Sequence, residues 1–308
     1  MAQTRKSAED DEMTETMHQS VLLATDLSPR SDRALDRALL LAREWRVPLV
    51  ALTVVPTGAG LVSHPMLALS SDAVAQRAAR RQAERRLRAD LAEASVPPIV
   101  RVEQGELTST VLAVAQAERC GLIVTGVARH EALARVLLGS TVEALARRAP
   151  VPLLVVRERA RAAYTQVLVT SDFSEHARHA LQTAVALFPQ ASFTLFHAFG
   201  NPYPLLAGMD VEQARQAGRA VAEEQARLFL DATPLPAAVR ARTTLRLAYG
   251  DPGLLLREHG AEHLGELVVL GTQRRSGLTG LLLGSVAERV LELAESDVLV
   301  VPPRPAAG

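Results

Sequence analysis

Two segments of this chain place glycine and serine at the start of a predicted helix, a combination suited to anion binding. Residues 271–291 read GTQRRSGLTGLLLGSVAERVL, in which Gly284 and Ser285 enter a run of apolar residues at helical spacing. Gly139 and Ser140 stand before a second such run. A helix start preceded by glycine presents backbone amides and the positive end of the helix dipole to a phosphate. Both segments therefore predict a site for a nucleotide-sized anion.

The other residues of these segments are expected to shape the backbone. Gly126 and Gly271 end apolar runs, where glycine would let the chain turn off a sheet. The Ser-x-x-Glu that begins at Ser140, like the one at Ser285, fits the capping box of a helix start. The lysine of a P-loop is missing, and no G-x-G-x-x-G follows the first apolar run. The segments therefore match neither of these two phosphate loops.

Two aspartates follow apolar runs that are predicted to be buried strands. The carboxylate of Asp26 or Asp172 could accept hydrogen bonds from hydroxyl or amino groups of a ligand at the strand end. The alternative is that each aspartate stabilises a turn, and the sequence leaves both roles open. Ser28, which Pro29 follows, and Ser174 are expected to begin helices as N-caps.

The elements that position these residues occur twice. VLLATDLSPRSDRAL, from Val21, aligns with VLVTSDFSEHARHAL, from Val167, and the glycine segments align at nearly the same offset. In each copy, short apolar runs alternate with segments of helical period, which predicts a parallel sheet with helices on both faces. Ligands bind such sheets at the carboxyl ends of the strands. We therefore predict an α/β fold with two repeated Rossmann-like domains, at 20–157 and 165–303.

Composition narrows the classes of function and location. The chain has 34 basic and 34 acidic residues, so no net charge draws it to nucleic acid or to an anionic membrane. The single cysteine, Cys120, excludes an intramolecular disulfide and is expected in the core. Residues 1–19 are polar and acidic, which predicts a disordered tail rather than a signal peptide. We expect a soluble, cytoplasmic protein without a nucleic-acid or membrane partner.

Three further patterns have simple structural explanations. HGAEH, from His259 to His263, matches the H-x-x-E-H zinc-protease motif, but it contains a glycine and lacks a candidate third ligand. His176 and His179 lie in an early helical turn and are expected at the surface. The arginine-rich segment RAARRQAERRLRADLAE is expected to form a solvated helix face.

With the aspartate and glycine signatures in the same order in both halves, the sequence resembles the universal stress protein family in its tandem form. The resemblance implies five-stranded parallel sheets of strand order 3-2-1-4-5. It also implies domains that pair through the last strand, either within the chain or in a homodimer. Many members bind ATP through the pattern G-x2-G-x9-G-[ST]. The resemblance therefore implies an ATP site, with or without magnesium, in a regulatory or sensing protein of the stress response whose protein partner is unknown.

The resemblance assigns each contact to a position of this chain. The first-strand aspartate and the end of the second strand would hold ribose and adenine, and the glycines and serine would hold the phosphates. The implied residues are Asp172, Ala198, Gly271, Gly284 and Ser285 in the second half, and Asp26, Val54, Gly126, Gly139 and Ser140 in the first.

Both halves depart from the pattern at its second glycine, where Arg129 and Arg274 stand. Such an arginine either fills the phosphate space or pairs with phosphate in a bidentate fork. We expect ATP binding in the second half above all, where Gly277 and Gly280 keep the loop pliant. The alternative is a nucleotide-free interaction and dimerisation module whose phosphate sites the arginines close. No set of nucleophile, base and orienting group recurs with the repeat, so we expect no enzyme, with slow ATP hydrolysis left open.

Overall fold

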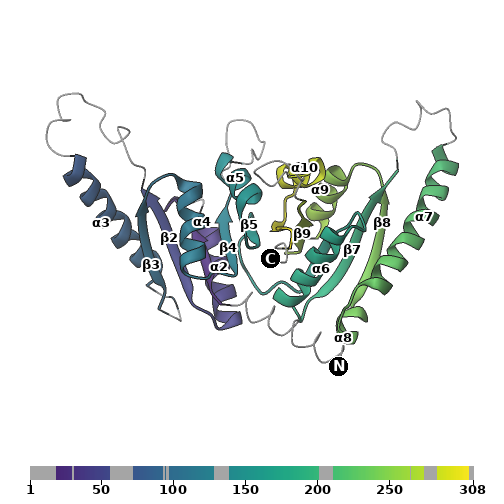
Figure 1. The fold of residues 1–308 in the computed structure, drawn as a ribbon, viewed down its shortest axis with the longest axis horizontal. Helices are drawn as coiled ribbons and strands as arrows, with labels where there is room; N and C mark the ends of the chain where they lie inside the picture. Colours follow the sequence, from purple (N-terminus) through teal and green to yellow (C-terminus); the bar gives the residue numbers. More distant parts are fainter. Residues whose placement is uncertain are drawn as a thin grey trace. The chain divides into compact units, whose positions relative to one another are not determined.

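The fold was analysed on a computed structural model that describes residues 19–29, 31–55, 72–92, 94, 97–127, 139–200, 211–263, 265–273 and 283–304. The described residues up to Ala163 form one compact unit, and those from Tyr164 onward form a second. Figure 1 colours the first unit from purple to teal and the second from teal to yellow. Residues 1–18 of the predicted tail lie outside the described residues.

The first domain is a five-stranded parallel sheet of order β3-β2-β1-β4-β5. Helix α2 packs on β1, β4 and β5, and α3 packs on β2 and β3. Helices α4 and α5 pack against each other. Right-handed crossovers place both of them on the face of the sheet opposite α2 and α3. The elements are β1 (Val21–Ala24), α2 (Asp32–Trp45), β2 (Leu49–Val55), α3 (Asp72–Asp90), β3 (Ile99–Gln104), α4 (Leu107–Ala117), β4 (Leu122–Gly126), α5 (Ser140–Arg148) and β5 (Leu153–Val156).

The second domain repeats this arrangement, with strand order β8-β7-β6-β9-β10. It adds one short helix, α8, before the edge strand β8. The elements are β6 (Gln166–Thr170), α6 (Glu175–Leu187), β7 (Ser192–Phe199), α7 (Val211–Ala232), α8 (Ala237–Arg240), β8 (Thr243–Tyr249), α9 (Pro252–Glu262), β9 (Leu267–Gly271), α10 (Ser285–Leu293) and β10 (Asp297–Val301). The predicted α/β class and the twofold repeat are confirmed.

The core of each domain is the sheet, whose inner strands are covered on both faces. Val21, Leu22 and Leu23 of β1 are fully buried, whereas most residues of the edge strands β3 and β8 are exposed or only partly covered. Cys120, just before β4, is buried as predicted, and this burial raises the pKa of its thiol. No helix in the described part of the chain is long and apolar enough to cross a bilayer.

The segment that follows β5 is held against α2 by arginine side chains. Arg33 donates to the carbonyl of Arg157 at 2.5 Å, and Arg37 donates to the carbonyl of Ala162 at 2.8 Å. Arg37 is only 3% exposed, so its charge is stabilised by polar groups rather than by bulk water. The segment between the repeats is therefore bound to the first domain at the carbonyls of Arg157 and Ala162.

The predicted helix start at Ser28 is wrong, whereas the one at Ser174 is confirmed. Ser174 is the N-cap of α6, and its hydroxyl accepts from the amide of Ala177 at 3.3 Å. Helix α2 begins only at Asp32, because the carbonyl of Ser28 accepts from the amide of Ser31 in an intervening turn. A serine followed by proline is compatible with such a turn as well as with an N-cap.

Candidate functional site

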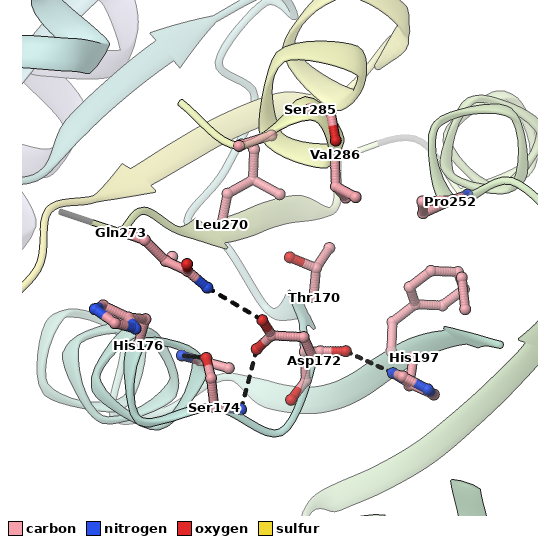
Figure 2. A pocket seen from close by; sticks show the side chains of 17 residues that line it. Thr170, Asp172, Ser174, His176, His197, Pro252, Leu270, Gln273, Ser285 and Val286 are labelled. Carbon is pink, nitrogen blue, oxygen red and sulfur yellow. Dashed lines mark hydrogen bonds between the residues drawn. The ribbon is translucent and has the colours of Figure 1, made fainter. Parts of the chain in front are cut away.

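A pocket of about 270 Å³ opens at the carboxyl edge of the second domain's sheet. The ends of β6, β7 and β9 form its floor, and the first turns of α6 and α10 form its sides (Figure 2). All five second-half residues singled out from the sequence line this pocket, although they come from four separate segments: Asp172, Ala198, Gly271, Gly284 and Ser285.

The start of α10 differs from the predicted capping box. Gly284, with φ −63° and ψ 152°, occupies the N-cap position, and its carbonyl accepts from the amide of Glu288 at 2.9 Å. A capping box needs serine at the N-cap, but Ser285 is already the first helical residue. Glycine has no side chain with which to cap α10, and no other described residue is found to cap it. Within the described part of the chain, the first amides of α10 therefore have no capping partner where Ser285, Val286 and Ala287 line the pocket.

Helix α5 of the first domain begins in the same way. Gly139 is its N-cap, with φ −62° and ψ 142°, and no side chain caps it. The capping box predicted from Ser140 is therefore wrong too, and Glu143 instead accepts from Arg147 at 2.6 Å. By contrast, α6 and α9, which border the pocket of the second domain, are capped by the side chains of Ser174 and Asp251.

Nothing in the described part of the chain requires glycine at position 284. Its φ lies in the region open to every residue, and a Cβ atom added there would meet no atom of the described residues within 4 Å. Because Gly284 lines the pocket, the missing side chain leaves the start of α10 accessible to a bulky group. This free space beside unpaired amides is what a bound phosphate needs.

Gly271 has a different role from the chain turn that the sequence suggested. Its φ is not positive, but an added Cβ would lie 2.8 Å from the carbonyl oxygen of His176 and 3.4 Å from the Cβ of Ala180. Glycine at the end of β9 therefore lets the first turns of α6 approach the strand closely. This approach forms one wall of the pocket.

Each aspartate both stabilises a turn and faces the pocket edge of its sheet. One Asp172 oxygen, Oδ1, accepts from the amide of Ser174 at 3.0 Å, and the other, Oδ2, lies 3.4 Å from Nε2 of Gln273 (Figure 2). In the first domain Asp26 accepts from the Ser31 hydroxyl at 2.6 Å. Burial opposes ionisation of Asp26, but hydrogen bonds from Ser31 and Ser28 hold its pKa below the usual value. Asp172 lines the pocket, and among the described residues its Oδ2 has the side-chain amide of Gln273 as its partner.

The sequence did not single out two further residues of the pocket. Nδ1 of His197 lies 2.7 Å from the carbonyl oxygen of Ser171, and its ring lies 4.3 Å from that of Phe173. Phe173 has φ +63°, which is unusual for a residue with a side chain. Its counterpart Leu27 has φ +59°, so the strained turn recurs in both domains. Gln273, beside Asp172, carries no sequence signal that would have marked it.

The first domain brings its candidate residues to the corresponding edge. Asp26 follows β1, Val54 lies near the end of β2, and Gly126 ends β4. Gly139 and Ser140 begin α5. The two arginines at the second-glycine position, Arg129 and Arg274, lie outside the described residues, as do Gly277 and Gly280.

The profile of the universal stress protein family matches this chain twice, over residues 17–157 and 163–302. The chain belongs to the universal stress protein family. Its two family domains follow each other in one chain, as the tandem resemblance implied.

Individual relatives among the universal stress proteins agree with this assignment. One from Mycolicibacterium smegmatis is 32% identical over 194 residues, 59% of this chain and 62% of the relative. One from Mycobacterium tuberculosis is 32% identical over 189 residues, 58% of this chain and 61% of the relative. The chain therefore spans about three fifths of the length of these curated relatives.

Solved structures support the same fold. A protein of unknown function from Pseudomonas aeruginosa covers 94% of this chain and 95% of its own, with a TM-score of 0.63 and 23% identity. A universal stress protein from Archaeoglobus fulgidus covers 92% of this chain and 98% of its own, with a TM-score of 0.59 and 17% identity. At sequence identities of 23% and 17%, these similarities establish a shared fold and nothing about function.

The HGAEH segment of this universal stress protein forms a buried polar pair. His259 is 5% exposed; its Nε2 lies 2.5 Å from Oε2 of Glu266, and its Nδ1 lies 2.5 Å from a guanidinium nitrogen of Arg246. Because arginine can only donate, Nδ1 is the acceptor and Nε2 carries the proton. Burial lowers the pKa of His259. Both ring nitrogens are thus engaged by protein groups.

The two histidines of α6 lie differently from the surface positions expected. His176 lines the pocket, near the first turn of the helix. His179 is half-buried, and its Nδ1 atom is inaccessible to solvent, so the prediction of a surface residue is wrong for it. Burial lowers the pKa of His179 to about 4.

Proposed function

We propose that the second domain binds an adenine nucleotide, ATP, and that the protein acts in the stress response as a regulator or sensor of that nucleotide. The observation that carries the proposal is Gly284. It stands at the uncapped start of α10, it lines the pocket, and neither its backbone angles nor its neighbours require glycine. A position where glycine serves no purpose in the fold is best explained by the space that it leaves for a ligand.

The residues around Gly284 fit the parts of a nucleotide. The amides at the start of α10 and the Ser285 hydroxyl would hold phosphates, because both donate hydrogen bonds at the positive end of the helix. Oδ2 of Asp172 would accept from a ribose hydroxyl. The base would lie near Ala198, at the end of β7, where the pocket is bordered by apolar side chains that include Leu270 and Phe196.

The proposal is one of binding rather than of efficient turnover. Asp172 already accepts from Ser174, and Nδ1 of His197 is directed to a backbone carbonyl. Neither therefore stands as an unengaged base beside a nucleophile, which efficient hydrolysis would need. A cytoplasmic location, where ATP is abundant and Cys120 would stay reduced, follows as part of the proposal.

The test is calorimetric titration of ATP into the full chain and two matched variants. Gly284→Ala puts a methyl group into the phosphate space, and we expect affinity to fall at least about tenfold, which corresponds to about 1.4 kcal/mol. Gly139→Ala makes the same change at the corresponding helix of the first domain, and it should leave the second-domain site intact. An absence of heat with the unmodified chain at millimolar ATP would overturn the proposal.

Loss of binding in Gly139→Ala but not in Gly284→Ala would assign the site to the first domain instead. Arg274→Gly then tests the arginine at the second-glycine position. Weaker binding in this variant identifies Arg274 as a phosphate ligand, and tighter binding identifies it as an obstruction.

A further inference from the structure

Helix α3 of the first domain carries an excess of positive charge that its counterpart lacks. Over its full length it has six arginines and three acidic residues, and all six arginines are exposed. Helix α7, the corresponding helix of the second domain, has three arginines and four acidic residues. Of these arginines, Arg219 pairs with Glu223 at 2.9 Å, and Arg227 pairs with Glu224 at 2.6 Å. The basic face is thus specific to α3.

The arginines of α3 form a stripe along its solvent side. Arg77, Arg81, Arg85 and Arg88 follow one another at spacings of four, four and three residues, so they share one helix face. Leu87, which is 1% exposed, packs on the sheet from another side of the helix. Arg88 of this stripe pairs with Glu84 at 2.7 Å. Arg81 and Arg85 have no acidic partner among the described residues.

The composition of this face limits its partner. A membrane-surface helix carries an apolar face as well as a basic one, but the exposed large apolar side chain of α3 is Val74 alone. Single-stranded nucleic acid is held by aromatic stacking, and α3 contains no aromatic residue. An acidic peptide segment needs neither feature, because guanidinium groups pair with carboxylates directly.

We propose that α3 binds the acidic segment of the same chain at residues 9–15. This segment, EDDEMTE, has five carboxylates in seven residues, the densest acidic run in a chain of zero net charge. Charge complementarity with the arginine stripe carries the proposal.

The length of chain before β1 permits this contact. Glu15 precedes Val21, the first residue of β1, by six residues, and Glu9 precedes it by twelve. At about 3.3 Å per extended residue these lengths reach about 20 and 40 Å. Strand β3, beneath α3, lies two strand spacings from β1, or about 10 Å. Figure 1 shows α3 running along β3, and after β2 the helix returns to the edge where β1 begins.

Disulfide trapping in the full chain tests the contact. Cys120 is replaced by alanine throughout, Thr14→Cys marks the acidic segment, and diamide is the oxidant. A second cysteine is placed on α3 by Ala78→Cys or, as a control, on α4 by Ala117→Cys. Ala117 is exposed on an uncharged helix, and the neighbouring carbonyl of Glu118 accepts from the Ser20 hydroxyl at 3.1 Å, where the chain enters the domain. Proximity along the chain alone would therefore favour a disulfide between position 14 and the control cysteine at position 117.

Each rate of intrachain disulfide formation is divided by the rate at which the same cysteine reacts with a neutral soluble disulfide. This correction is needed because nearby arginines raise thiol reactivity. At 50 mM salt we expect Ala78→Cys to be trapped about tenfold faster than Ala117→Cys, and at 1 M salt we expect the advantage to vanish as charges are screened. Arg81→Gln with Arg85→Gln should remove the advantage. The matched pair Arg219→Gln with Arg227→Gln on α7 should retain it.

Three results would overturn the proposal. The first is a rate at Ala78→Cys that does not exceed the control or does not depend on salt. The second is a disulfide-linked dimer that forms faster at higher protein concentration, which would assign the face to a second copy. The third is binding of a duplex RNA that requires Arg81 and Arg85 while the intrachain disulfide does not form, which would assign the face to phosphates.

Discussion

Gly271 and Gly284 belong to one sequence motif, but substitution by alanine should affect them in opposite ways. At Gly271 the new methyl group would lie 2.8 Å from the backbone oxygen of His176, closer than carbon and oxygen approach without displacement. A backbone carbonyl within a helix cannot rotate away, so α6 must shift. Overpacking of this kind costs about 1–3 kcal/mol of folding free energy. At Gly284 an added Cβ would meet no atom of the described residues within 4 Å, and we expect alanine there to cost less than about 0.5 kcal/mol of folding free energy.

Chemical denaturation of the two variants measures this contrast. Far-UV circular dichroism follows both domains, whereas fluorescence of Trp45, the single tryptophan, reports on the first domain. Gly271→Ala should lower the midpoint of the circular dichroism transition, and amide exchange should increase in β9 and α6. Gly284→Ala should match the unmodified protein in stability while it loses ATP affinity. A Gly271→Ala variant of full stability would refute the assignment of this glycine to close packing.

Three further predictions concern acidic groups and a buried histidine. Asp172→Asn should weaken ATP binding about tenfold by calorimetry, because an amide accepts a ribose hydroxyl less strongly than a carboxylate does; Asp26→Asn is the matched control. Asp251→Ala removes the N-cap of α9 and should cost about 1 kcal/mol in chemical denaturation, unlike Glu262→Ala at the other end. The pKa of His179 falls from 6.5 to about 4 on folding, so the unfolded chain binds the extra proton. Stability should therefore decrease by about 2 kcal/mol between pH 7 and pH 4.5, and His179→Gln should flatten this dependence; an unchanged pH profile in that variant would contradict the assignment.

Features set by the order of residues along the chain were predictable from the sequence. The alternation of apolar runs such as VLLATD with helical segments indicated the parallel sheet, because strands buried on both faces need continuous apolar residues. The repeat then placed Asp172, Gly271 and Gly284 at one edge, since carboxyl ends of parallel strands share an edge. The shared edge of these three residues therefore followed from topology, whereas Ala198 was indicated only by the family resemblance.

Features set by contacts between distant residues were not predictable. The packing of Gly271 on His176 joins positions far apart in sequence, and no local pattern distinguishes it from a turn. The capping box failed because the motif Ser-x-x-Glu does not fix which residue adopts the N-cap angles, and Gly284 took that position. His197 lines the pocket near the end of β7, and its ring lies 4.3 Å from that of Phe173 in the turn after β6, a contact between segments that no local pattern marks.

If ATP binds as proposed, the uncapped start of α10 couples the order of this helix to its ligand. Another helix start at this pocket, that of α9, completes its hydrogen bonds with the side chain of Asp251, so it does not need a ligand for them. A helix that relies on a bound phosphate is instead stabilised by RT ln(1 + [ATP]/Kd), about 2.7 kcal/mol when ATP exceeds its Kd a hundredfold. The thermal unfolding midpoint of the second domain would then rise and fall with the energy charge of the cell. On the proposed function, the protein would report nucleotide level through its own resistance to unfolding.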